Sequence, residues 1–196
     1  QDAYNFTNEK ALAENIVQLN SIASWVYELP FGRGRRMMTS APAFINAALG
    51  GWQMDGIWNW RTGLPLTISS PACANCAMGG DRTTRADIVS GVSPSVPNPS
   101  AALWFNPNAF VVQSTPYGTV GRDTIWGPHL QQWDLGFAKR FSLAEQRYFQ
   151  FRGELFNAFN QVNLKPPAST AGSAGFGTIT AALPGRNVQL GLKFYW

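Results

Sequence analysis

The sequence predicts an all-β protein, made of the antiparallel strands of a transmembrane β-barrel with long extracellular loops. Three observations favour this class. The last ten residues alternate between apolar and other side chains and end on the aromatic Trp196. The composition is 13% aromatic and only 13% charged, which leaves few charges to cover a soluble domain of 196 residues. No run of 18 apolar residues occurs, so any membrane crossing must be made by strands.

The first two predicted strands lie near residues 16–29 and 51–68. In both, one face is largely apolar and the other is mixed or polar, as expected of a strand between lipid and a lumen. Pro30 and Gly32 end the first strand, and the residues after Pro42 are compatible with a short helix. The apolar faces give the lipid-facing candidates Trp25, Tyr27, Trp52, Trp58 and Trp60. The opposite face of the second strand gives the lumen-facing candidates Gln53, Asp55, Asn59 and Arg61.

Three further strands are predicted near residues 132–141, 148–160 and 187–196, the first two joined as a hairpin. Their lipid-facing candidates are Trp133, Phe137, Phe149 and Phe151, and their lumen-facing candidates are Asp134, Arg140, Arg152, Glu154 and Lys193. Because Glu154 and Lys193 share the inward face of adjacent antiparallel strands, we expect interstrand charge pairing among Arg152, Glu154 and Lys193. The simplest role for the lumen-facing residues is to hydrate and brace the wall, and they tune selectivity only where they meet a solute.

Two Gly-, Pro- and Ser-rich stretches, residues 69–130 and 161–185, are predicted to be long loops. If the last strand ends on the inner side of the membrane, both long stretches fall outside. The connections at residues 30–50 and 142–147 then fall inside. Long outer loops and mostly short inner turns are typical of outer-membrane barrels, although the connection at 30–50 is longer than expected.

Residues that could carry chemistry are few. Cys73 and Cys76 form a C-x-x-C in the first long loop, where a small disulfide is a more natural interpretation than half of a metal site. His129 is the only histidine and has no recognisable catalytic partners. The basic residues are scattered apart from a short cluster at residues 32–36, which argues against nucleic-acid binding. We therefore expect no enzyme, no metal site and no cofactor.

The sequence also carries a family resemblance. The ending QLGLKFYW resembles the barrel-assembly signal of outer-membrane proteins, through Gln189, Gly191, Phe194 and Trp196. Upstream, five segments resemble, in order, the end of the barrel of TonB-dependent receptors, especially the Oar-like group that carries a carboxypeptidase-regulatory-like domain. These segments are WVYELPFGRGRR (25–36), GGWQMDGIWNWRTGLPLTI (50–68), WFNPNAF (104–110), GRDTIWGPHLQQWDLGFAKRF (121–141) and FRGELFNAFN (151–160).

The resemblance implies that residues 1–196 are the C-terminal part of a receptor barrel, with about five strands of a presumed 22. In that family the barrel encloses a plug domain, a solute binds the extracellular loops and lumen, and TonB remodels the plug. Neither a plug, a TonB box nor a signal peptide is visible in this sequence. We therefore expect a fragment or truncated product that is not transport-competent alone.

The resemblance further implies a location in the bacterial outer membrane and several partners. These are outer-membrane lipid, the barrel-assembly machinery, the rest of the barrel with its plug and TonB, and an unidentified solute. The alternative interpretation is a soluble or surface β-sandwich that binds carbohydrate, in which exposed Trp residues stack on sugar rings.

Overall fold

The computed structural model describes residues 6–7, 9–13, 15–71, 84–114, 116–143 and 147–196. The chain divides into two compact units. One unit, called the sheet unit here, comprises Ser21–Trp60, Gln131–Val162 and Pro184–Trp196. The other, called the loop unit, comprises Gln1–Asn20, Arg61–Leu130 and Asn163–Leu183. Each unit is described by itself.

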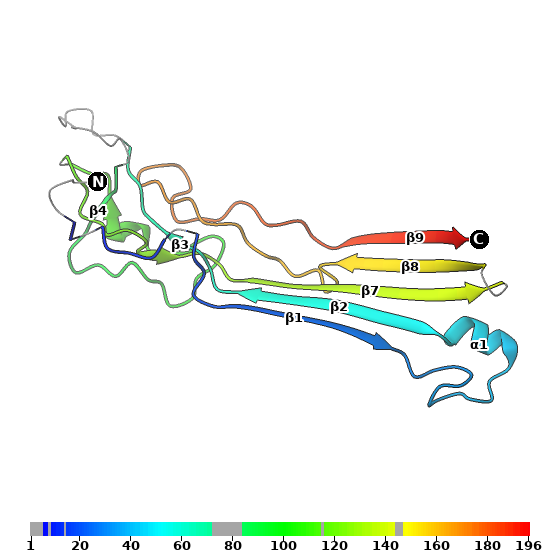
Figure 1. Ribbon diagram of the computed structural model, residues 1–196. Helices are drawn as coiled ribbons and strands as arrows, with labels where there is room; N and C mark the ends of the chain where they lie inside the picture. Colours follow the sequence, from blue (N-terminus) through cyan, green and yellow to red (C-terminus); the bar gives the residue numbers. More distant parts are fainter. Residues whose placement is uncertain (1–5, 8, 14, 72–83, 115, 144–146) are drawn as a thin grey trace. The chain divides into compact units, whose positions relative to one another are not determined.

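The sheet unit is built on one five-stranded sheet in the order β1-β2-β7-β8-β9, so each strand lies beside the long strand that precedes it in the chain. The arrows of neighbouring strands alternate in direction, which makes the sheet an antiparallel meander (Figure 1). Strands β1 and β9 form its two edges, and the sheet is open. The five strands are β1 (Asn20–Glu28), β2 (Trp52–Arg61), β7 (Leu130–Ser142), β8 (Tyr148–Phe156) and β9 (Asn187–Tyr195).

Each predicted strand region contains one of these strands, but several boundaries differ. Strand β1 begins only at Asn20, because the backbone N–H groups of Gln18 and Leu19 donate to the hydroxyl of Thr62 and not to a carbonyl ladder. Strand β2 ends at Arg61, and the predicted extension to residue 68 contains only the two-residue β3 (Pro65–Leu66). Strand β8 ends at Phe156 because the next residue, Asn157, has a φ of 51°, which an extended strand cannot accommodate.

The register of β7, β8 and β9 separates the side chains onto two faces. Phe151 pairs with Leu192 and Phe149 with Phe194, which places aromatic and aliphatic groups together on one face, called the apolar face. On the other, called the polar face, Gln150 pairs with Lys193. This separation follows from the period of two in strand geometry. The apolar and polar side chains that the sequence alternates therefore occupy opposite faces.

Strands β1 and β2 continue the same two faces. On the apolar side, the ring of Trp52 meets Phe151 edge-on at 6.0 Å, and the indole of Trp25 covers Gly56. On the polar side, the Asp55 carboxylate lies over Gly136, where even a Cβ atom would come within 2.4 Å of a carboxylate oxygen. The aromatic residues Trp25 and Trp52 therefore lie on one face of the sheet, and Asp55 lies on the other.

Lys139 departs from this division, and sequence reasoning missed it. It pairs with Phe151 in the register and so lies on the apolar face, yet its side chain is only 3% exposed. Its ammonium donates to the carbonyl of Ala48 at 2.9 Å and lies 5.5 Å from the Trp52 ring and 5.0 Å from the Phe141 ring. The hydrogen bond and the two cation–π interactions compensate the free-energy cost of burying the ammonium charge.

The Ala48 carbonyl belongs to the short helix α1 (Ala43–Leu49), which begins directly after Pro42 as the sequence indicates. The same carbonyl also accepts a hydrogen bond from the Trp52 indole nitrogen at 2.9 Å. Two side chains of the apolar face therefore hold the end of α1. No helix among the described residues has the length and apolar character needed to span a membrane.

The loop unit has a hydrophobic core of its own. Phe105, Phe110 and Phe176 form a three-way cluster with ring centroids 5.1 to 6.1 Å apart. Regular structure around this core is short and consists of β3 paired with β6 (Ile125–Trp126), β4 (Asp87–Ile88) paired with β5 (Phe110–Val111), and the 3-10 helix η1 (Pro107–Ala109). The described residues of the stretches that the sequence predicts as long loops thus have little regular structure but contribute to a packed core.

Buried polar groups reinforce this unit. Arg85, which is buried, forms an ion pair with Glu9. The Asp87 carboxylate accepts hydrogen bonds from the backbone N–H groups of Ser114 and Thr119. Such bonds satisfy backbone groups that an irregular chain cannot pair within a sheet. Ordered packing therefore extends through segments without repeating secondary structure.

Candidate functional site on the polar face of the sheet

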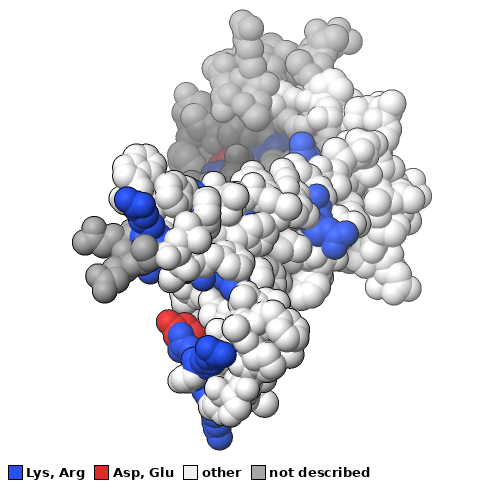
Figure 2. All heavy atoms as spheres, turned by 90° about the vertical axis from the view of Figure 1, so that its right-hand side faces the viewer, with Lys and Arg blue, Asp and Glu red and all other residues white. Residues whose placement is uncertain are grey.

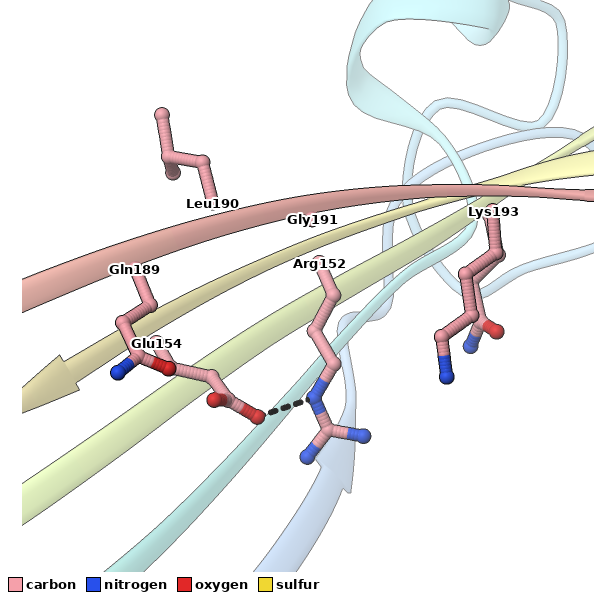
Figure 3. Close-up of a pocket in the computed structure, with 7 residues that line it drawn as sticks. Arg152, Glu154, Gln189, Leu190, Gly191 and Lys193 are labelled. Carbon is pink, nitrogen blue, oxygen red and sulfur yellow. Dashed lines mark hydrogen bonds and ion pairs between the residues drawn. The ribbon is translucent and has the colours of Figure 1, made fainter.

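The polar face carries its densest group of polar side chains on β8 and β9. Gln150, Arg152 and Glu154 follow one another at every second position of β8, and the facing positions of β9 are Lys193, Gly191 and Gln189. Because Gly191 has no side chain, it leaves the space opposite Arg152 open. The result is a hollow of about 440 Å³ lined by these groups (Figure 3).

Arg152 and Glu154 form an ion pair in this hollow, with 2.6 Å between Nε and Oε1. The two residues belong to the same strand, so the expected interstrand pairing is wrong in this respect. The two side chains remain 51% and 32% exposed, and a pair open to water contributes at most about 1 kcal/mol to stability. The pair orients two charged groups toward the hollow more than it holds the sheet together.

Lys193 does not join this pair. In the register Lys193 faces Gln150, whereas Glu154 faces Gln189. Four residues separate these positions along a strand, which corresponds to about 13 Å. The expectation that Lys193 pairs with Glu154 is therefore wrong, and the hollow presents an ammonium group apart from the guanidinium–carboxylate pair (Figure 3).

A second hollow of about 310 Å³ lies further along the polar face. Its polar lining includes Gln53, Arg140 and Gln150 from three strands. It also includes Glu28 and Arg35, which form an ion pair at 2.5 Å. The polar face therefore carries several side chains of both charge signs, suited to binding a polar solute or a hydrated protein surface.

Two aromatic rings border this group. Tyr148 and Tyr195 stack with 4.4 Å between ring centroids, and the Tyr195 hydroxyl lies 3.4 Å from the Gln150 side-chain oxygen. The Arg140 guanidinium lies 5.2 Å from the Tyr148 ring. Both tyrosines lie on the polar face, because Tyr148 precedes Phe149 and Tyr195 follows Phe194, the two phenylalanines that pair on the apolar face.

Other predicted lumen-facing residues serve the fold. The Asp134 carboxylate accepts hydrogen bonds from the side chain of Gln132 and from the backbone N–H of Asn157 at 2.8 Å. Asp134 thereby stabilises the turn that follows β8. Asp55 covers Gly136, and Asn59 is in part buried, with no hydrogen-bond partner for its side-chain oxygen among the residues that the structure describes. For Asp134 and Asp55 the bracing role suggested by the sequence fits the geometry.

Within the described residues, no three His, Cys, Asp or Glu side chains come together as a metal-binding group. The predicted Cys73–Cys76 disulfide lies outside the described residues. His129 lies in the loop unit beside a small cavity of about 90 Å³, which is also lined by Arg61 and Lys165.

An antiparallel sheet with one polar face and one exposed apolar face is the structure of a wall segment in a membrane β-barrel. The comparison with protein families agrees with this class. A family described as outer membrane beta barrel domain matches residues 1–189, and the chain belongs to this family. The protein is therefore located in the bacterial outer membrane. No curated protein and no solved structure matches the chain.

Membership of this family favours the barrel over the alternative of a carbohydrate-binding β-sandwich. The sheet unit agrees, because its strands form one sheet and not two sheets packed face to face. Trp52 and Trp58 lie on the apolar face of the sheet and are half-buried there. Tryptophan is common near the membrane interfaces of membrane proteins, so these residues do not require a sugar ligand.

Proposed function

We propose that this chain forms part of the barrel wall of a TonB-dependent receptor that takes up a solute across the outer membrane. In this proposal the apolar face of the sheet meets lipid and the polar face lines the lumen. The connections at residues 29–51 and 143–147 lie on the periplasmic side. Residues 62–129 and 157–186, which connect β2 to β7 and β8 to β9 in the chain, supply extracellular loops.

The observation that carries this proposal is the exposed apolar face of β9. Leu190 and Leu192 are 74% and 67% exposed, and Val188 and Phe194 extend the same apolar row. A contiguous apolar surface of this kind is unfavourable in water but is stable against hydrocarbon. The polar side chains on the opposite face of the same strand are stable in contact with water, which a barrel lumen provides.

The edge of β9 supports a larger barrel around this segment. Every residue from Asn187 to Tyr195 is exposed, and β9 has one neighbour, β8. Unpaired backbone groups inside a membrane are costly, so β9 needs a further strand in the assembled protein. We propose that this partner is the first strand of the receptor barrel, and that Gln189, Gly191, Phe194 and Trp196 are recognised by the barrel-assembly machinery.

In the proposed receptor, this chain supplies part of the barrel wall and its extracellular loops, while the plug domain and TonB open the path of the solute through the barrel. It performs no catalysis and holds no cofactor. The charged groups that face the solute are Arg152, Glu154 and Lys193, since they line the larger hollow of the polar face. Selectivity for the solute then depends on these side chains together with the packed segments of the loop unit.

The orientation of the sheet can be tested with single cysteines in the intact protein, after Cys73 and Cys76 are replaced by serine. Lys193 and Leu192 are neighbours on opposite faces. A small charged thiol reagent added to whole cells should modify Lys193→Cys but not Leu192→Cys, because only a lumen is open to water. Equal modification of both variants would contradict the assignment of the faces.

The receptor role is tested by solute uptake in the natural host. Cells that carry the intact gene should accumulate one solute from a panel of iron chelates, oligosaccharides and peptides. Deletion of either the gene or TonB should abolish that accumulation, because energy for the plug comes through TonB. Accumulation that persists without TonB would mean that the barrel is a passive channel or has a different role.

A further inference from the structure

An apolar groove lies on the apolar face, where residues 29–51, called the linker segment here, approach the sheet. Its volume is about 600 Å³. The linker segment contributes Phe31, Met38 and Leu49, and the sheet contributes Phe137, Gly153 and Leu190 among others. Nearly all of the surface that lines the groove is apolar. Hydrocarbon therefore suits this groove better than a polar ligand does.

The floor of the groove is open because of Gly153. In the register, Gly153 lies between Phe137 of β7 and Leu190 of β9, both of which carry large side chains. A Cβ atom added to Gly153 would meet Leu190 only at an ordinary contact distance of 3.5 Å. A methyl group would thus fit, whereas a larger side chain would occupy the space of the groove.

The linker segment is fixed in place above the sheet. Lys139 and the Trp52 indole both donate to the carbonyl of Ala48 at 2.9 Å, which holds the end of α1. At the start of the segment, the backbone N–H of Met37 donates to Pro30 at 2.8 Å, and that of Gly32 donates to Met37 at 3.0 Å. The linker segment forms one wall of the groove and the sheet forms the other, and the hydrogen bonds above hold the two walls in place.

Two arginines that do not line the polar-face hollow, Arg33 and Arg36, lie in a turn of the linker segment whose ends line the groove. The turn that begins at Phe31 and ends at Met38 has both ends in the groove lining, and its tip carries three exposed arginines. Arg35 is paired with Glu28, and Arg33 donates through Nε to the carbonyl of Ala41. Arg36 has no partner among the described residues. Figure 2 shows blue spheres at the lower end of the view, where the linker segment lies, with a red group beside them.

We propose that this groove binds one phospholipid with an anionic headgroup, with an acyl chain along the groove and the phosphate at Arg33 and Arg36. An apolar channel beside guanidinium groups matches an amphiphile with a phosphate, since guanidinium binds phosphate oxygens through paired hydrogen bonds. The inference rests on the proposed orientation, because the linker segment then reaches the phospholipid leaflet on the periplasmic side. The lipid anchors the linker segment to the membrane boundary.

The test uses the intact protein in lipid nanodiscs that contain phosphatidylglycerol with a photoactivatable acyl chain. After illumination, mass spectrometry maps the labelled residues. We expect labelling of Met38 and Leu49 to exceed that of Leu192 and Phe194, which lie on the same face outside the groove. Phosphatidylcholine with the same chain should label the groove about thirtyfold less, since each of the two arginines near an anionic lipid contributes about 1 kcal/mol.

Two variants separate the chain from the headgroup. The exposed pair Arg33→Gln and Arg36→Gln should reduce labelling by phosphatidylglycerol to the level of phosphatidylcholine. Gly153→Leu should reduce groove labelling by both lipids, whereas the matched control Val188→Leu, on the apolar face outside the groove, should not. If folding of Gly153→Leu fails, the arginine variant still decides the charge dependence.

Two results would overturn the inference in different ways. Uniform labelling of the apolar face by both lipids would mean that the groove is only solvated by the membrane and holds no specific lipid. Labelling of polar-face residues such as Lys193 and Gln189 would instead overturn the assignment of the faces and with it the proposed function.

Discussion

Replacement of Phe105 by alanine should lower the free energy of unfolding of the loop unit by about 3–5 kcal/mol, the usual cost of deleting a buried aromatic side chain. Phe105 is 2% exposed and packs edge-on against Phe110 and Phe176. Its removal leaves a cavity among residues that are far apart in the sequence, and the irregular backbone around them has few ladder hydrogen bonds to compensate.

Hydrogen exchange in the intact protein measures this effect. The amide of Ala86, which donates to Ile68, and the amide of Val120, which donates to Ala86, should exchange faster in Phe105→Ala. Amides within β8 should keep their protection. The matched control is Leu103→Ala, since Leu103 is 42% exposed. Unchanged protection of Ala86 and Val120 would show that the aromatic cluster does not hold the loop unit together.

A charge placed on the apolar face should have the second large effect. Leu192→Arg is expected to cost about 2–4 kcal/mol in membrane stability, because an arginine near the middle of the lipid face must leave water. The same arginine at Gln189, on the polar face beside Glu154, should cost less than about 1 kcal/mol. The two sites lie on one strand, so secondary-structure preference changes little between them.

The measurement is a urea titration of folding of the intact protein into lipid vesicles, with the wild type and both variants compared at equal salt. A larger loss for Gln189→Arg than for Leu192→Arg would reverse the two faces. A small effect of both substitutions would indicate that β9 lies outside the hydrocarbon.

The parts of the structure that could be predicted from the sequence are those governed by short-range periodicity. Alternation at every second residue defined the five long strands and divided Phe151 from Arg152 and Leu192 from Lys193. This works because a strand side chain has only two possible faces. The aromatic and aliphatic residues of one face therefore remain visible in the sequence without any knowledge of their neighbours.

Strand ends and pairing partners could not be predicted in this way. Asn157 and Asn160 adopt left-handed φ angles of 51° and 53°, which end the strand. The apolar alternation of the sequence continues through Phe159, so it does not indicate where the strand ends. Strands β8 and β9 are joined by a long connection that does not fix their register, and a shift of four residues decides whether Glu154 faces Lys193 or Gln189. The sequence placed the charges on the correct face but not opposite the correct partner.

Long-range contacts account for the other differences. The ammonium group of Lys139 would destabilise the apolar face without its hydrogen bond to the Ala48 carbonyl, which is 91 residues away in the chain. The core of the loop unit joins Ile68, Phe105 and Ala171, whose spacing follows no helix or strand period. Patterns in a sequence report local geometry, so a core assembled from irregular segments leaves no period to detect.

The separate core of the loop unit also bears on how this protein can change over generations. All eight buried residues of that core, from Ile68 to Ala171, belong to the loop unit, and none belongs to the strands of the sheet unit. Mutations on the surface of the loop unit therefore leave these eight core positions unchanged. Selection can accordingly diversify the exposed side chains of the segments proposed to recognise a solute while it conserves the core that packs them.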